Sequence, residues 1–171
     1  MKNVTSLYRI MISSLLSAAF FVSAANAGDV EIKWTSPDDY QDIKESNFER
    51  KSQFREHLFE SLDLHFAKLA NDLPVGSTLK IEVIDLALAG DRRIGPNEIR
   101  VISNHYPPRI KLSYQLTTAD QQILASGEDN YRDMHFMASK SFYPPRERFL
   151  YEKVMLDKWF KRTFVHLLTT P

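Results

Sequence analysis

The stretch Arg109-Ile-Lys-Leu-Ser-Tyr-Gln-Leu116 decides the fold, because apolar and polar side chains alternate along its whole length. Alternation with a period of two is typical of a β-strand, whose successive side chains point to opposite faces of a sheet. The apolar side chains must pack against other elements of the fold, whereas the basic and polar side chains must be exposed to water. The sequence therefore predicts a sheet that is dry on one face and wet on the other.

A hairpin is predicted directly after this stretch. Thr117-Thr-Ala-Asp-Gln121 has the composition of a turn, and residues 123–132 follow as the returning strand. Gly127 lies within that strand, and a glycine there predicts a bulge or a bend. The two strands of this hairpin must be antiparallel.

Three more strands are predicted earlier in the chain. Val30-Glu-Ile-Lys-Trp34 alternates apolar and charged residues, and residues 79–86 form a longer apolar strand. Residues 91–97 contain charged residues, glycine and proline, which predicts a polar loop. Residues 98–103 follow as a short third strand.

Two long amphipathic helices are also predicted. Residues 46–71 carry apolar side chains at steps of three and four, which gives one wide stripe on a helix. Leu73-Pro-Val-Gly76 then ends that helix, because proline cannot continue the backbone bonding. A second helix is predicted from Pro145 to about Leu168, since proline is favoured at the first helical position.

The predicted order of elements is β-α-β-β-β-β-α. A strand, a long helix and a second strand favour a parallel pair joined by a right-handed crossover, while the later hairpin is antiparallel. We therefore expect an α+β fold: a two-layer sandwich with a mixed, mostly antiparallel sheet of about five strands and both helices on one face. No repeat or linker interrupts residues 28–171, which are predicted to be one domain.

Residues 1–27 are predicted to be a secretory signal peptide. Lys2 and Arg9 precede a run of mostly apolar residues that ends near Ala24, and Ala25-Asn-Ala27 matches the small-x-small pattern that a signal peptidase cleaves. The run is shorter than the roughly 20 apolar residues of a membrane span. We expect cleavage between Ala27 and Gly28 and export to a bacterial periplasm.

The composition excludes several classes of function. The chain has 171 residues and no cysteine, so disulfides, thiolate metal sites and lipid attachment through cysteine are excluded. It has 22 basic and 22 acidic side chains, and cleavage removes two of the basic ones. This balance gives no field for binding nucleic acid. The five glycines are dispersed and form no phosphate loop, so we expect no cofactor.

Four stretches together resemble a known family. They are Leu79-Lys-Ile-Glu-Val-Ile-Asp-Leu-Ala-Leu-Ala-Gly90, Pro108-Arg-Ile-Lys-Leu-Ser-Tyr114, Ile123-Leu-Ala-Ser-Gly-Glu-Asp129 and Tyr151-Glu-Lys-Val-Met-Leu-Asp-Lys-Trp-Phe160. In this order they are similar to the exported bacterial proteins grouped as domain of unknown function 3016. The resemblance implies a signal peptide and one compact domain, with no known activity, cofactor or catalytic residue. Leu88 departs from the acid often found there in the family, which weakens a binding role for the following loop.

The candidate binding residues come from two features. The tetrapeptide Tyr-Pro-Pro-Arg occurs at residues 106–109 and again at residues 143–146. Its prolines stiffen the chain before the next element, and its tyrosines and arginines could alternatively line one rim that holds a carboxylate or a sugar. The second feature is the loop over residues 85–97, a usual place for binding. The candidate binding residues are Asp85, Arg92, Arg109, Asp133, Tyr143 and Arg146.

Three functions remain open from the sequence. The leading interpretation is a non-catalytic domain that binds an envelope protein or a small polar ligand. The first alternative is a hydrolase that uses the acids Asp85, Asp129 and Asp133, and the second is a metal-handling protein that uses His57 and Glu60, three residues apart on one helix. Oligomeric state and the identity of any partner do not follow from the sequence.

Overall fold

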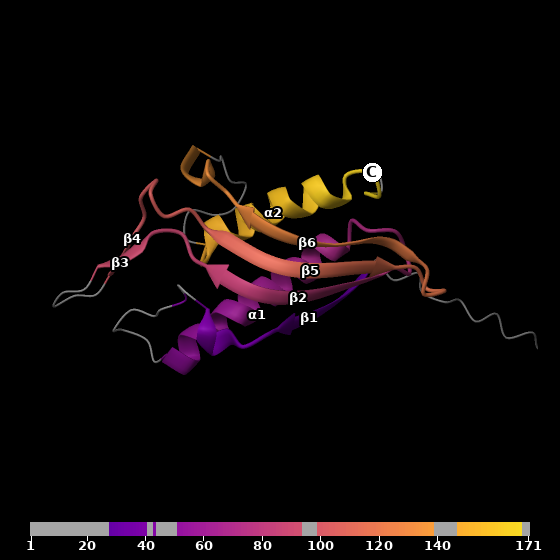
Figure 1. Cartoon of the computed structure of the whole chain (residues 1–171), viewed down its shortest axis with the longest axis horizontal. Coiled ribbons are helices and arrows are strands. Elements are labelled where there is room, and N and C mark those ends of the chain that lie inside the picture. The colour runs from indigo at the N-terminus through magenta and orange to yellow at the C-terminus, as the bar shows by residue number, and fades with distance from the viewer. Residues whose placement is uncertain (1–27, 41–42, 44–50, 94–98, 139–146, 169–171) are drawn as a thin grey trace, which may run out of the picture.

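The computed structural model describes residues 28–40, 43, 51–93, 99–138 and 147–168 (Figure 1). The predicted signal peptide lies outside these residues. The strands are β1 (Asp29–Trp34), β2 (Thr78–Ala87), β3 (Asp91–Arg93), β4 (Ile99–Val101), β5 (Arg109–Thr117) and β6 (Ile123–Arg132). The helices are α1 (Lys51–Ala70) and α2 (Leu150–Phe164), and the short 3₁₀ turns are η1 (Pro37–Asp39) and η2 (Phe136–Ala138).

The main sheet has four strands in the order β1-β2-β5-β6. The strand β1 is parallel to β2, while β2 with β5 and β5 with β6 are antiparallel. The predicted mixed sheet, parallel β-α-β pair and hairpin are therefore confirmed. The α+β order of elements is confirmed as well.

The predicted strand at residues 98–103 does not join this sheet. Its described part, β4, pairs instead with β3 in a separate two-stranded ribbon that projects beyond the end of the sheet (Figure 1). The prediction of a plain loop over residues 91–97 is wrong for β3. The chain leaves β2 at Ala89 and Gly90, whose carbonyl oxygens accept hydrogen bonds from Arg100 Nη1 at 3.3 and 3.0 Å. These hydrogen bonds join β4 to the segment between β2 and β3.

Both helices cover the same face of the sheet, as the sequence predicts. The buried apolar residues of α1, α2, β2 and β5 form one core cluster, and the helices lie side by side behind the strands in Figure 1. On α1 the buried apolar side chains follow at intervals of four: Leu58, Leu62, Phe66 and Ala70. On α2 the buried apolar side chains are Val154, Met155, Leu156, Trp159, Phe160 and Phe164.

The ends of the helices differ from the prediction. The helix α2 begins at Leu150, because Phe149 adopts a left-handed backbone conformation with φ of 55°. The predicted start at Pro145 lies outside the described residues. At the other end α2 stops at Phe164, and residues 165–167 form a turn rather than a continued helix. The helix α1 ends before Leu73-Pro-Val-Gly76, as predicted.

The predicted bulge at Gly127 is wrong, and the glycine has another role. The register shifts instead between Val83 and Asp85 on β2 and between Leu116 and Thr117 on β5. Gly127 is paired with Tyr114, and a Cβ atom built on it would lie 3.0 Å from the phenol oxygen of that residue. The missing side chain makes room for an aromatic ring.

Candidate binding face

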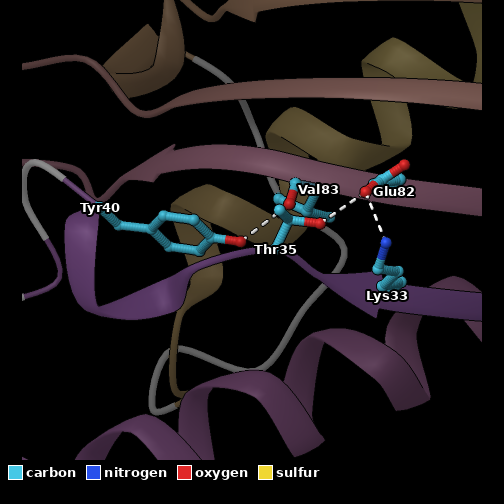
Figure 2. Close-up of polar contacts among 5 residues, drawn as sticks. All are labelled: Lys33, Thr35, Tyr40, Glu82 and Val83. Atoms are coloured by element: carbon cyan, nitrogen blue, oxygen red, sulfur yellow. Dashed lines mark hydrogen bonds and ion pairs between the residues drawn. The ribbon is translucent and has the colours of Figure 1, made fainter.

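The uncovered face of the sheet carries cross-strand ion pairs on β1 and β2. The parallel register sets Glu31 opposite Lys80 and Lys33 opposite Glu82, and the paired side chains meet at 3.2 and 2.9 Å. Thr35 Oγ1 donates a second hydrogen bond to Glu82 Oε1 at 2.7 Å (Figure 2). The hydrogen bonds from Lys33 and Thr35 lower the pKa of Glu82, so this carboxylate stays charged.

These charged residues border a hollow in the face. Its volume is about 500 Å³, and it extends from β1 across β2 to Ser113 and Gln115 on β5. Cavities of about 300–1,000 Å³ are the usual size for ligand sites, but this hollow is open to solvent along the sheet. The arrangement offers paired charges of both signs, a hydroxyl group and an amide within one shallow depression, and we name it the outer-face hollow.

Tyr40 fixes the segment that follows β1 to the edge of this region. Its hydroxyl group donates a hydrogen bond of 2.9 Å to the carbonyl oxygen of Val83, which also accepts the Thr35 N–H at 2.9 Å (Figure 2). Burial raises the pKa of Tyr40 to about 12. The Tyr40 phenol therefore stays protonated at neutral pH. It shares the Val83 carbonyl oxygen with Thr35, the residue that donates to Glu82.

Two of the predicted binding residues meet on the same face. Asp85 is opposite Lys111 in the register of β2 and β5, and Arg109 Nη2 donates to its Oδ2 at 2.5 Å. Both side chains are mostly covered. The pair lies toward the other end of β2 from the outer-face hollow and consists of two groups that already neutralise each other.

The other predicted binding residues do not join that pair. Asp133 follows β6 and is buried, and Lys158 Nζ of α2 donates to its Oδ2 at 2.5 Å. It therefore belongs to the helical layer and not to the open face. The side chain of Arg92 and both Tyr143 and Arg146 lie outside the described residues.

The three acids of the hydrolase alternative do not converge. Asp129 is opposite Leu112, a core residue, and it accepts hydrogen bonds from Trp159 Nε1 at 2.9 Å and Arg162 Nη2 at 3.2 Å. Asp129 therefore faces the helices, whereas Asp85 lies on the opposite face of the sheet. Two carboxylates that act on one bond must face the same cleft, and the sheet separates Asp85 from Asp129. Asp133 lies on the helix side with Asp129, but its carboxylate is ion-paired with Lys158.

The metal alternative places His57 beside a cation. His57 Nδ1 lies 3.3 Å from Arg148 Nη1, and Glu60 borders the same small cleft between α1 and the start of α2. A guanidinium group next to the imidazole disfavours a divalent ion there. Within the described part of the chain, no three or more histidine, aspartate or glutamate side chains gather as a metal site would require.

Trp34 connects β1 to α1, and His65 connects α1 to α2. Trp34 Nε1 donates to Asp63 Oδ1 at 2.9 Å, and its ring stacks on Phe59 with 4.4 Å between ring centroids. His65 is buried on α1, and its Nε2 lies 2.8 Å from Asp157 Oδ1 of α2. Both contacts satisfy polar groups at the edge of the core, so these side chains have a structural role.

One buried carboxylate at the base of the ribbon escaped the sequence analysis. Glu152 of α2 accepts a 2.7 Å hydrogen bond from the backbone N–H of Ala89. Burial raises its pKa, while this hydrogen bond and the nearby Arg100 act in the opposite direction. Leu88, which precedes Ala89, is buried in the core, so its side chain serves packing and is not available to a ligand.

The residues of the outer-face hollow were only partly predictable. The alternation of residues 109–116 predicts that Ser113 and Gln115 face water, but it does not predict how the charges of β1 and β2 align. The signal was present: Glu31 and Lys33 on one strand match Lys80 and Glu82 on the other in order and opposite in sign. A parallel register brings these four side chains together.

The fold and this face define a class: a two-layer α+β domain with a mixed sheet. Two helices cover one side of the sheet, and no described element covers the other. A family model described as a protein of unknown function (DUF3016) matches residues 28–162, and the chain belongs to this family. The resemblance noted from the sequence is confirmed. No curated protein and no solved structure matches the chain. None of the described helices has the length and apolar character that crossing a membrane requires.

Proposed function

We propose that this protein is an exported, non-catalytic binding domain that docks a periplasmic envelope protein on its outer-face hollow. The observation that carries the proposal is the hollow itself, a depression of about 500 Å³ on a sheet face that neither of the described helices covers. The charges on it are paired, with Glu31 to Lys80 and Lys33 to Glu82. A partner surface with alternating charges of both signs complements such a face.

The boundary of the domain supports export. The family match begins at residue 28, the first residue after the predicted cleavage site. Gly28 is buried, and a Cβ atom on it would lie 2.6 Å from the carbonyl oxygen of Ala70. The N–H of Asp29 donates to the carbonyl oxygen of Ser77 at 2.8 Å. The fold thus uses the chain from residue 28 onward, as removal of residues 1–27 requires.

Absence of convergent chemistry in the hydrolase set favours binding over catalysis. Asp85 is neutralised by Arg109, Asp133 by Lys158, and Asp129 by Arg162 together with an indole N–H. Carboxylates held in ion pairs on two faces of a sheet stabilise the fold. They do not supply the paired acid and base that hydrolysis needs.

Site-specific crosslinking in intact cells tests the proposal. A photoreactive amino acid is placed at Gln115 in the outer-face hollow and, as a control, at Lys161, which is exposed on α2. We expect one defined protein adduct from position 115 and none from position 161. The charge reversal Lys80→Glu should reduce that adduct several-fold without unfolding the protein.

Four outcomes would overturn the proposal. Equal adducts from both positions, or no adduct from position 115, would remove the hollow as a protein-docking surface. A small polar molecule retained by protein purified from the periplasm, detected by native mass spectrometry and lost in Lys80→Glu, would replace the protein partner with a ligand. Turnover of ester, glycan or peptide substrates by the same preparation would replace binding with catalysis.

A further inference from the structure

The free edge of β1 is the starting point of an inference that does not depend on the proposed function. Among the described residues, β1 pairs with β2 on one side only and is the outermost strand of the sheet. The backbone N–H groups of Asp29 and Thr35 donate to the segment containing β2, at Ser77 and Val83. Because backbone groups alternate in direction along a strand, the N–H groups of Val30, Ile32 and Trp34 are directed to the free edge.

A second hollow follows this edge on the side of the helices. It has a volume of about 320 Å³ and is lined by Val30, Ile32, Asp63, Leu64 and Ala67. The side chain of Leu64 is among the most exposed large apolar ones, with 67% of the residue accessible. A strand added beside β1 would point every second side chain into this hollow and so cover Leu64.

We propose that the occupant is a second copy of this chain, paired through β1 in antiparallel orientation with Ile32 facing Ile32 on the two-fold axis. This register sets Glu31 opposite Lys33 of the second copy and Lys33 opposite its Glu31. Val30 then lies opposite Trp34 on the side of the helices. The residues whose N–H groups face the edge become the hydrogen-bonded pairs of the new ladder.

Charge complementarity selects the second copy over an unrelated strand. In the isolated chain Glu31 is paired with Lys80, and Lys33 with Glu82. In the proposed dimer each β1 charge would lie between two opposite charges, one on its own β2 and one on the second copy. The ion pairs would continue across the axis of a sheet of eight strands, and opposite charges in directly facing positions stabilise strand pairing. The edge is therefore self-complementary, as a two-fold interface requires.

In the monomer, the side chain of Asp29 caps one backbone group at this edge. Its Oδ1 accepts the N–H of Val30 at 2.8 Å, which satisfies one of the edge groups when no strand is added. Side chains that cap edge groups are a common protection against random pairing. On pairing, the carbonyl oxygen of Trp34 from the second copy takes the place of this carboxylate.

Paired charge reversals test the register. Lys33→Glu gives a strand with two acids facing the axis, and Glu31→Lys gives one with two bases. Both side chains are more than half exposed, so the fold should be retained. Using each purified protein, we expect each variant alone to dimerise at least about tenfold more weakly than the wild type. An equimolar mixture should recover dimers, as measured by sedimentation velocity.

A disulfide test gives an independent readout. The chain has no cysteine, so Ile32→Cys introduces a single thiol on the proposed axis. Facing residues of a hydrogen-bonded antiparallel pair have Cα atoms about 5.5 Å apart, within the range of a disulfide. We expect oxidation to crosslink Ile32→Cys and not Ile123→Cys, a control at the opposite edge of the sheet.

Three results would overturn the inference. A wild-type chain that stays monomeric at high micromolar concentration would do so. A mixture of the two charge variants no more dimeric than either alone would exclude the register. Equal crosslinking at positions 32 and 123 would show that the thiols react without a defined interface. Failure of a charge variant to fold would leave the disulfide test to decide.

Discussion

Replacement of Tyr40 by phenylalanine gives the sharpest check on the contacts beside the outer-face hollow. Tyr40 is buried, and its hydroxyl group donates a hydrogen bond to the carbonyl oxygen of Val83. The variant loses this hydrogen bond, but the carbonyl oxygen keeps the N–H of Thr35 as a partner. We therefore expect the free energy of unfolding at pH 7 to fall by only about 1 kcal/mol.

The same residue makes this difference depend on pH. Burial raises the pKa of Tyr40 from 10.0 to about 12 in the folded protein. Above pH 10 the unfolded chain releases the phenol proton while the folded chain keeps it, so the stability due to Tyr40 is lost as pH rises from 10 to 12. Two pKa units correspond to at most about 2.7 kcal/mol, and solvent access near the hydroxyl group reduces this to about 1–2 kcal/mol.

Parallel denaturant titrations of the wild type and Tyr40→Phe at pH 7, 9, 10, 11 and 12 measure the effect. The difference in free energy of unfolding between the two proteins cancels the titration of all other groups. We expect the wild type to be the more stable protein up to about pH 10 and to lose this advantage by pH 12. A difference that stays constant across this range would refute the assignment of the buried, hydrogen-bonded phenol.

Three further changes test the packing and the buried carboxylate. Leu62→Ala should lower the free energy of unfolding by about 2–5 kcal/mol, whereas Val165→Ala at an exposed site should change it by less than about 0.5 kcal/mol in the same titrations. Gly28→Ala should lower the melting temperature, because its Cβ atom would meet the carbonyl oxygen of Ala70 at 2.6 Å; an unchanged value would argue against this packing. Burial raises the pKa of Glu152 above its ordinary value of 4.5. The free energy of unfolding of the wild type should therefore fall relative to that of Glu152→Gln as pH rises above 4.5. A fall on acidification instead would contradict the raised pKa.

Local sequence patterns predicted the layers of the fold because each element needs one apolar side. The period of two over residues 109–116 and the steps of three and four on α1 each identify a single dry surface. Joining those surfaces allows few arrangements, and the predicted two-layer sandwich was among them. The parallel pair of β1 and β2 was also predictable, since a long helix connects them.

Patterns were less informative about the ends of elements and about single glycines. Phe149 in a left-handed conformation starts α2 five residues after Pro145, and no propensity assigns that conformation to phenylalanine. Gly127 looked like a bulge, but the ring of Tyr114 on the neighbouring strand explains it. Both outcomes depend on contacts with distant parts of the chain.

The sequence by itself determined which side chains seek water and which avoid it, and with them the class of fold. Only the tertiary structure decided which charges meet. The register of β1 on β2 sets Glu31 beside Lys80, and the sheet places Asp85 and Asp129 on opposite faces. The physical reason is range: amphipathic periodicity is a property of neighbours along the chain, whereas an ion pair depends on how separate strands align in space.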